Sequence, residues 1–124
     1  HRSRMELLNT QLGYVPGRNT SAYYAAMYLL TSNEIIYWRM ANCFCHDGID
    51  FQYAILRGVS TYNYALYRAA LALTTDRQGV TVSELDDTEL IGDEVFRLII
   101  NAMLIARYGL TVMKLTKGDD ANDS

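Results

Sequence analysis

The segment that most constrains this fold runs from Gly92 to Gly109. Residues 95–108 are almost all apolar, but Arg97, Asn101 and Arg107 interrupt them, and the segment is too short and too charged for a membrane span. Gly92 followed by an acidic residue is typical of a helix start, and Gly109 stands where helices commonly end. The sequence therefore predicts a hydrophobic core helix that ends at Tyr108.

Shorter helices are expected before this one, because polar residues that can cap a first turn precede several apolar stretches. By contrast, Gly13, Pro16 and Gly17 predict a loosely structured lead-in over residues 5–18. The expected helices are residues 22–30 after Asn19–Ser21, a helix after Ser32 or Asn33 that reaches about Cys45, residues 51–57 after Asp50, a helix opened by Ser60, and a short acidic helix with a capping box from Ser83 to Asp86.

The predicted fold class is all-α: a compact bundle of five or six short helices around residues 95–108. Half of the 124 residues are hydrophobic, which suits one domain with a substantial core. Residues 80–82 and 110–115 are candidates for a small two-stranded β-ribbon. We expect residues 1–4 to be an expression-tag remnant, 5–118 a single helical domain, and 119–124 a disordered acidic tail.

Cys43, Cys45 and His46 form the one cluster of metal-ligand types. Structural zinc sites use two separated ligand pairs, and the chain has no second pair. We therefore expect two small buried thiols beside a surface histidine, and neither a metal site nor a Cys–His catalytic pair. The close spacing also argues against a disulfide, and free thiols favour a cytoplasmic location.

No phosphate-binding glycine loop, GxSxG or HExxH pattern is present, and no pair of carboxylates has an evident apolar setting. The sequence therefore predicts no cofactor and no catalytic residue. A small enzyme or a small-ligand-binding protein with a pocket between helices is kept as the alternative function.

An acidic segment carries the first candidate binding site. Its six carboxylates fall within eleven residues without a lysine or arginine among them: Glu84, Asp86, Asp87, Glu89, Asp93 and Glu94. One interpretation is a solvated acidic face whose carboxylates stabilise the N-termini of the two predicted helices that start there. The other is a docking patch for a basic partner, including one that normally holds nucleic acid. The same charges argue against direct nucleic-acid binding, because they would face phosphates.

Tyrosine and arginine are the second unusual feature. Ten of the fourteen aromatic residues are Tyr, and nine of the eleven basic residues are Arg, a composition that interface hot spots favour. Tyr64 and Arg68 lie one helical turn apart and are candidates for stacking. Either these tyrosines form a core with hydrated hydroxyls, or some of them form a contact surface, including one for self-association.

The run from Ala22 to Leu30, with Ser60 and the run from Arg68 to Leu73, resembles a family of uncharacterised small helical proteins (a domain of unknown function) that mobile elements of gut bacteria encode. The likeness covers about half the chain. The Cys43–Asp47 segment and the acidic stretch depart from it. The resemblance implies a bacterial or phage accessory protein that acts by contact, and no activity comes with it.

These observations together favour a protein-interaction module. Its expected partner is another protein with a basic, nucleic-acid-binding surface, which the module would modulate or inhibit.

Overall fold

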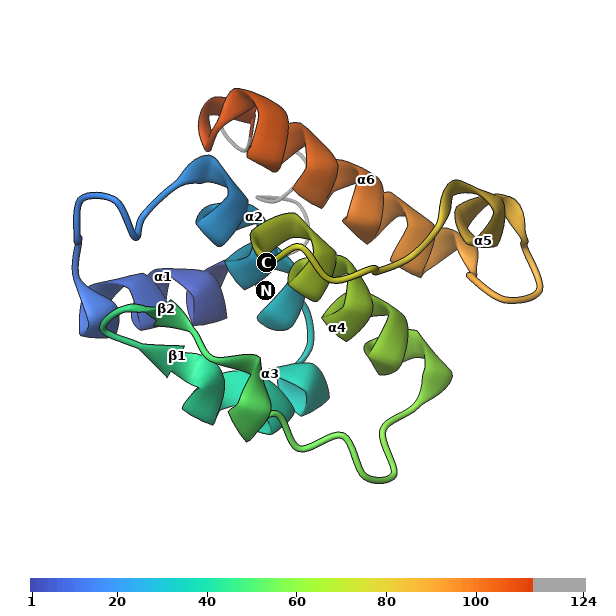
Figure 1. Ribbon diagram of the computed structural model, residues 1–124, viewed down its shortest axis with the longest axis horizontal. Coiled ribbons are helices and arrows are strands. Elements are labelled where there is room, and N and C mark those ends of the chain that lie inside the picture. The colour runs from blue at the N-terminus through green and yellow to red at the C-terminus, as the bar shows by residue number, and fades with distance from the viewer. Residues whose placement is uncertain (113–124) are drawn as a thin grey trace.

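A computed structural model describes residues 1–112 of the chain, and within them the fold is a small bundle of helices (Figure 1). Its six α-helices are α1 (Arg2–Leu12), α2 (Ser21–Leu30), α3 (Glu34–Met40), α4 (Thr61–Thr74), α5 (Val82–Asp86) and α6 (Asp93–Tyr108). Two short 3₁₀ helices, η1 (Ala41–Cys43) and η2 (Phe51–Tyr53), flank a ribbon of two strands, β1 (Phe44–Cys45) and β2 (Gly48–Ile49). The prediction of a compact, mostly helical fold is confirmed.

Helix α2 lies at the centre of the core, between α4 and α6 (Figure 1). Its residues Ala25, Ala26, Met27, Leu29 and Leu30 are completely buried. Helix α6, expected to be the centre, buries only one face and exposes apolar residues such as Met103 and Leu104. The difference arises because α2 is apolar nearly all round, whereas Arg97 and Arg107 hold the outer face of α6 in water.

The N-terminal segment is helical up to Leu12, so the predicted loose lead-in is wrong for residues 5–12, whereas residues 13–18 form coil and turns as predicted. Helix α1 packs Met5 and Leu8 into the core and ends at Gly13, which adopts a left-handed conformation with φ 68°. Glycine and proline therefore end this helix and do not prevent it. Residues 2–4, expected to be a tag remnant, belong to α1, and Arg4 donates to the carbonyl oxygens of Thr31 (2.7 Å) and Ser32 (3.0 Å). Whether they are a remnant stays a prediction.

The predicted ribbon exists at a different place. Phe44 pairs with Ile49, and Cys45 pairs with Gly48, in an antiparallel register. Residues 80–82 form no strand, because Thr81 caps α5, and Val82 is its first residue. The other expected strand, 110–115, begins with helical residues at 111–112, and its remainder lies outside the described residues, as does the predicted tail 119–124.

Four of the predicted caps are confirmed by side-chain hydrogen bonds: Thr20 for α2, Asn33 for α3, Asp50 for η2 and Ser60 for α4. Two helices are shorter than expected, because α3 ends at Met40 and the segment after Asp50 forms only η2. The capping box starts at Thr81 and not at Ser83: Thr81 accepts from the Glu84 N–H, and Glu84 accepts from the Thr81 N–H.

Candidate functional site

Residues 82–94, here called the acidic arm, comprise α5, the turn after it and the first two residues of α6, and they contain all six predicted carboxylates. Figure 1 shows α5 projecting from one end of the molecule, beside the start of α6. None of the residues of α5 is buried. The arm is therefore held by contacts at its base, while its tip is in solvent.

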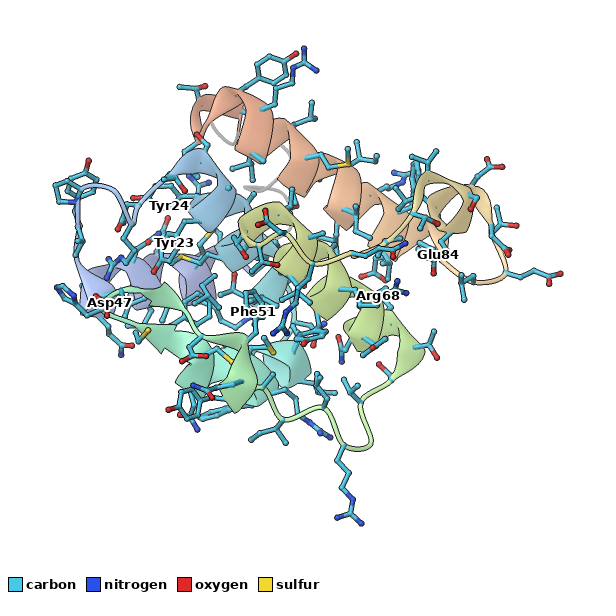
Figure 2. The ribbon with its side chains drawn as sticks, in the orientation of Figure 1. Tyr23, Tyr24, Asp47, Phe51, Arg68 and Glu84 are labelled. Atoms are coloured by element: carbon cyan, nitrogen blue, oxygen red, sulfur yellow. The ribbon has the colours of Figure 1, made fainter. Side chains whose placement is uncertain are left out.

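An ion pair anchors this base. Arg68 of α4 donates from Nη1 to Glu84 Oε2 at 3.0 Å, and the two side chains are 28% and 27% exposed (Figure 2). Arg68 also donates from Nη2 to the Gly79 carbonyl oxygen at 2.6 Å. The Thr81 N–H and Arg68 together hold the pKa of Glu84 below its ordinary value. The carboxylate is therefore ionised across the neutral range.

A small cavity next to this ion pair brings three of the predicted site residues together. Tyr64, Arg68 and Glu84 line a cavity of about 80 Å³ between α4, α5 and the turn before α6, together with Thr61, Ala65, Val80, Leu90 and Ile91. Tyr64 stacks on Tyr67, with ring centroids 5.7 Å apart. Arg68 makes its contacts with Glu84 and Gly79, so the expected Tyr64–Arg68 stacking is replaced by an ion pair. The cavity is too small for most ligands and is part of the support of the arm.

The two carboxylates at the start of α6 have local partners. Asp93 pairs with Arg97 one turn later at 3.2 Å, and both side chains are exposed. The Tyr62 hydroxyl hydrogen-bonds to Glu94, and burial together with this carboxylate raises the pKa of Tyr62 to about 12. These two acids support α6 and its contact with α4.

The remaining three acids lie toward the tip of the arm. Asp87 accepts from the N–H groups of Glu89 (3.0 Å) and Leu90 (3.3 Å), which closes the turn between α5 and α6. Asp86 and Glu89 are exposed, and their carboxylates have no partner within residues 1–112. Of the six predicted residues, these two are therefore the ones free to meet a partner.

Apolar side chains accompany these carboxylates, and sequence reasoning missed them. Val82 is 84% exposed and Leu90 is 44% exposed. Val82 was expected to be in a strand, but it is the first residue of α5, and its side chain is exposed to solvent. In α5 only Glu84 and Leu85 are partly buried, and Leu85 packs against the core while Val82 does not.

A second exposed apolar surface lies on α3. Trp38 is 69% exposed, and Ile35 one turn earlier is also exposed. The following loop lies alongside, because Ile55 donates to the Arg39 carbonyl oxygen at 3.0 Å and Arg39 donates to the carbonyl oxygens of Ile55 and Arg57. Tyr53 and Ile55 are exposed as well, so the expectation that some tyrosines reach the surface is confirmed for Tyr53 and Tyr64.

The two cysteines lie in different environments, one before the ribbon and one in it. Cys43 is buried, and burial raises the pKa of its thiol to about 11, with Asp50 adding to this effect. Cys45 is exposed and donates to the Gly48 carbonyl oxygen at 3.3 Å, so the expectation of two buried thiols is wrong for Cys45. Side chains alternate along a strand, so Phe44 faces the core and Cys45 faces away. Among residues 1–112, His, Cys, Asp and Glu form no cluster that could hold a metal ion.

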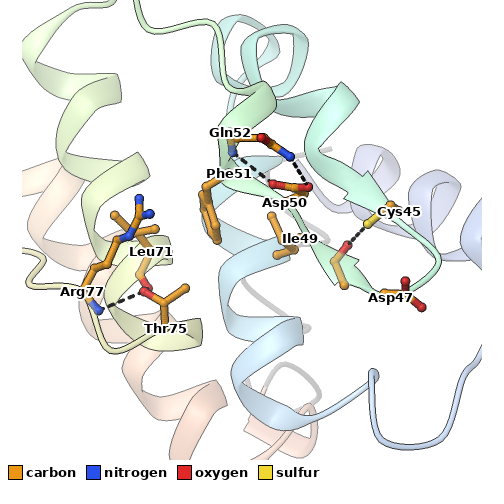
Figure 3. A pocket seen from close by; sticks show the side chains of 10 residues that line it. Cys45, Asp47, Ile49, Asp50, Phe51, Gln52, Leu71, Thr75 and Arg77 are labelled. Atoms are coloured by element: carbon orange, nitrogen blue, oxygen red, sulfur yellow. Dashed lines mark hydrogen bonds between the residues drawn. The ribbon is translucent and has the colours of Figure 1, made fainter.

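An open cleft of about 560 Å³ lies between this ribbon and the C-terminal end of α4 (Figure 3). Its lining residues are Cys45, Asp47, Gly48, Ile49, Asp50, Phe51, Gln52, Leu71, Thr75 and Arg77. None of them belonged to a predicted site, since ribbon and helix end are far apart in the sequence. This volume belongs to a groove that is widely open to solvent and not to an enclosed pocket.

Comparisons with family models, with curated proteins and with solved structures find no match for this chain. Over residues 1–112, no helix combines the length and the apolar character that crossing a membrane requires.

Proposed function

We propose that this protein is a protein-interaction module, which binds a basic partner through the acidic arm. The observation that carries the proposal is the exposure of Val82 and Leu90 on a segment whose free carboxylates, Asp86 and Glu89, lie between them in the sequence. Apolar side chains gain free energy when a partner covers them, and unpaired charges around them select the sign of that partner.

The electrostatics of the arm support a basic partner. From Gln78 to Phe96 the chain contains no lysine or arginine, and within residues 1–112 the ion pairs of Arg68 and Arg97 involve Glu84 and Asp93, not the acids at the tip. Such a one-sign surface raises the association rate of an oppositely charged protein and suppresses binding of acidic ones. The same field opposes the phosphates of a nucleic acid, which leaves a protein as the partner.

The base of the arm supports a preorganised binding surface. Arg68 holds Glu84 and Gly79 together, and Asp87 closes the turn that presents Leu90. A backbone already held in one conformation loses less entropy when it binds. A rigid acidic surface suits a protein that occupies the basic face of a nucleic-acid-handling partner and modulates or inhibits it. The resemblance to mobile-element proteins adds a bacterial or phage accessory setting to this proposal.

Charge reversal at the tip tests the proposal. Tagged wild-type protein and the variant D86K/E89K are incubated with nuclease-treated lysate of a bacterial host, at low and moderate salt, and bound proteins are identified by mass spectrometry. We expect a stoichiometric basic protein with the wild type, weaker at moderate salt, and its loss with the variant. These two positions make no structural hydrogen bond through their side chains in residues 1–112, so the fold is kept.

The matched control is E34K/D76K, which makes the same change of net charge outside the arm, at two exposed acids without a side-chain partner within residues 1–112, and is expected to retain the partner. A partner that D86K/E89K binds as well as the control does would contradict the proposed site. The absence of any partner of the wild type at both salt concentrations would contradict the interaction function itself.

Small-ligand binding is the second candidate function. It is supported by the open cleft between the ribbon and α4, which combines apolar lining residues with charged ones.

A further inference from the structure

The cleft between the ribbon and α4 has walls of opposite charge. The ribbon and the residues directly after it carry Asp47 and Asp50, and the end of α4 carries Arg77 (Figure 3). Within residues 1–112 the Arg77 guanidinium makes no ion pair, although its backbone N–H donates to Thr75 Oγ1 at 3.1 Å. One side of the cleft therefore carries a cation without a carboxylate partner among the described residues, and the other side carries two carboxylates; Arg77 and Asp47 are exposed to solvent, and Asp50 is partly buried.

The carboxylate of Asp50 is held in place by its neighbour. Gln52 donates from Nε2 to Asp50 Oδ2 at 2.8 Å and from its backbone N–H to Oδ1 at 3.3 Å. No cation contacts Asp50 within the described part of the chain. Asp47 lies at the exposed edge, with His46 Nδ1 3.3 Å from its Oδ1. Both acids retain the capacity to accept further hydrogen bonds.

Apolar side chains occupy the space between the charged walls. Figure 3 shows Ile49 and Phe51 on the ribbon side facing the α4 end, where Leu71 lies. Phe51 is fixed by an edge contact with Tyr67, with ring centroids 5.9 Å apart. Phe51 and Leu71 are nearly buried, so these two side chains form a base for the cleft. The lining therefore has three parts: acidic, apolar and basic.

We propose that this cleft binds a small zwitterion with an apolar body, of the size and chemistry of a free dipeptide. The ammonium group would meet the carboxylates of Asp47 and Asp50, the apolar side chains would cover Phe51 and Leu71, and the carboxylate would meet Arg77. This proposal rests on the second candidate function, small-ligand binding, and does not involve the acidic arm.

Cys45 supplies a reporter for the test. Its thiol lines the cleft and is exposed, whereas Cys43 is buried with a pKa of about 11, so a thiol reagent at neutral pH labels Cys45 first. A bound molecule slows that labelling. The probes are phenylalanyl-leucine, its C-terminal amide and its N-acetyl form, which carry both charges, the positive charge alone and the negative charge alone. Backbone amide shifts measured by NMR give an independent affinity.

We expect phenylalanyl-leucine to bind about tenfold more tightly than either blocked form. In Arg77→Gln, phenylalanyl-leucine should no longer bind more tightly than its amide. In Asp47→Asn, the difference in affinity between phenylalanyl-leucine and its N-acetyl form should become smaller. The matched controls Arg57→Gln and Asp76→Asn lie outside the cleft lining and should leave both differences in affinity unchanged. Equal binding of all three probes would overturn the zwitterion proposal and leave small-ligand binding standing. No protection or shift with any probe up to about 10 mM would overturn both.

Discussion

The guanidinium of Arg68 lies 3.0 Å from the carboxylate of Glu84 and joins α4 to α5 across sixteen positions of the chain. The same side chain donates to the carbonyl oxygen of Gly79, so it contacts both the connection that precedes the arm and the arm itself. The two side chains are 28% and 27% exposed, so water screens this pair less than it screens a fully exposed pair. The position of the acidic arm therefore depends on one arginine.

Stability should fall in acid partly through Glu84. The Thr81 N–H and Arg68 lower the pKa of this carboxyl in the folded protein below its ordinary value of 4.5. Its contribution to the free energy of unfolding is therefore complete above about pH 4.5 and disappears as the pH falls through the lower folded value. We expect wild type and Glu84→Gln to differ in urea unfolding at pH 7 and to converge toward pH 3.

The control for this titration is Glu89→Gln, which removes an exposed carboxylate without a partner in the described residues. It should unfold like wild type at both pH values. A difference between wild type and Glu84→Gln that stays constant down to pH 3 would rule out the ion pair as the source.

Gly79 should tolerate no side chain. A Cβ atom at this position would overlap the Ala72 side chain and the Arg68 carbonyl oxygen, and both belong to helix α4. Gly79→Ala should destabilise the protein by about 1–3 kcal/mol, because neither neighbour can move freely. Gly92→Ala, where a Cβ meets nothing within 4 Å, should cost less than about 1 kcal/mol. Thermal unfolding of both variants checks this, and equal losses would contradict the close approach of Gly79 to α4.

Because α2 is the central helix, replacing a leucine by alanine should lower stability more in α2 than in α6. Leu29 in α2 is completely buried, whereas Leu104 in α6 is 38% exposed. Leu29→Ala should cost about 2–5 kcal/mol, since it leaves a cavity in a packed core. Leu104→Ala should cost clearly less, because water already reaches that side chain. Chemical unfolding measures both, and a larger loss at Leu104 would place the core around α6 instead.

Asn33 and Asn63 should be energetically coupled. Asn33 caps α3 through Oδ1 at 2.9 Å from the Ile36 nitrogen, and its Nδ2 donates to Oδ1 of the buried Asn63 at 2.7 Å. Replacing either residue by alanine leaves the other polar group unpaired and costs about 1–3 kcal/mol. A double-mutant cycle should give a coupling of at least about 0.5 kcal/mol. The pair Asn33→Ala and Thr81→Ala, whose caps share no partner, should be additive.

Helix starts were predictable because a cap is a local interaction. Thr20, Asn33 and Ser60 each bind an N–H group three residues later, so the information lies within one turn. Helix α6 was predicted with both ends correct for the same reason: Gly92 and Gly109 border a strongly periodic apolar segment. The acidic segment, too, could be identified as a candidate site from its charges alone.

The sequence by itself therefore determined the helical class of this protein, most helix starts and the presence of a concentrated acidic segment. Only the tertiary structure decided which helix forms the centre, which carboxylates are used internally and which remain free, and that ribbon residues and the end of α4 form one cleft. The physical reason is the distance along the chain over which each interaction acts. Capping and periodicity act over a few residues, whereas burial of α2 and the Arg68–Glu84 pair require segments that are distant in the chain to pack together.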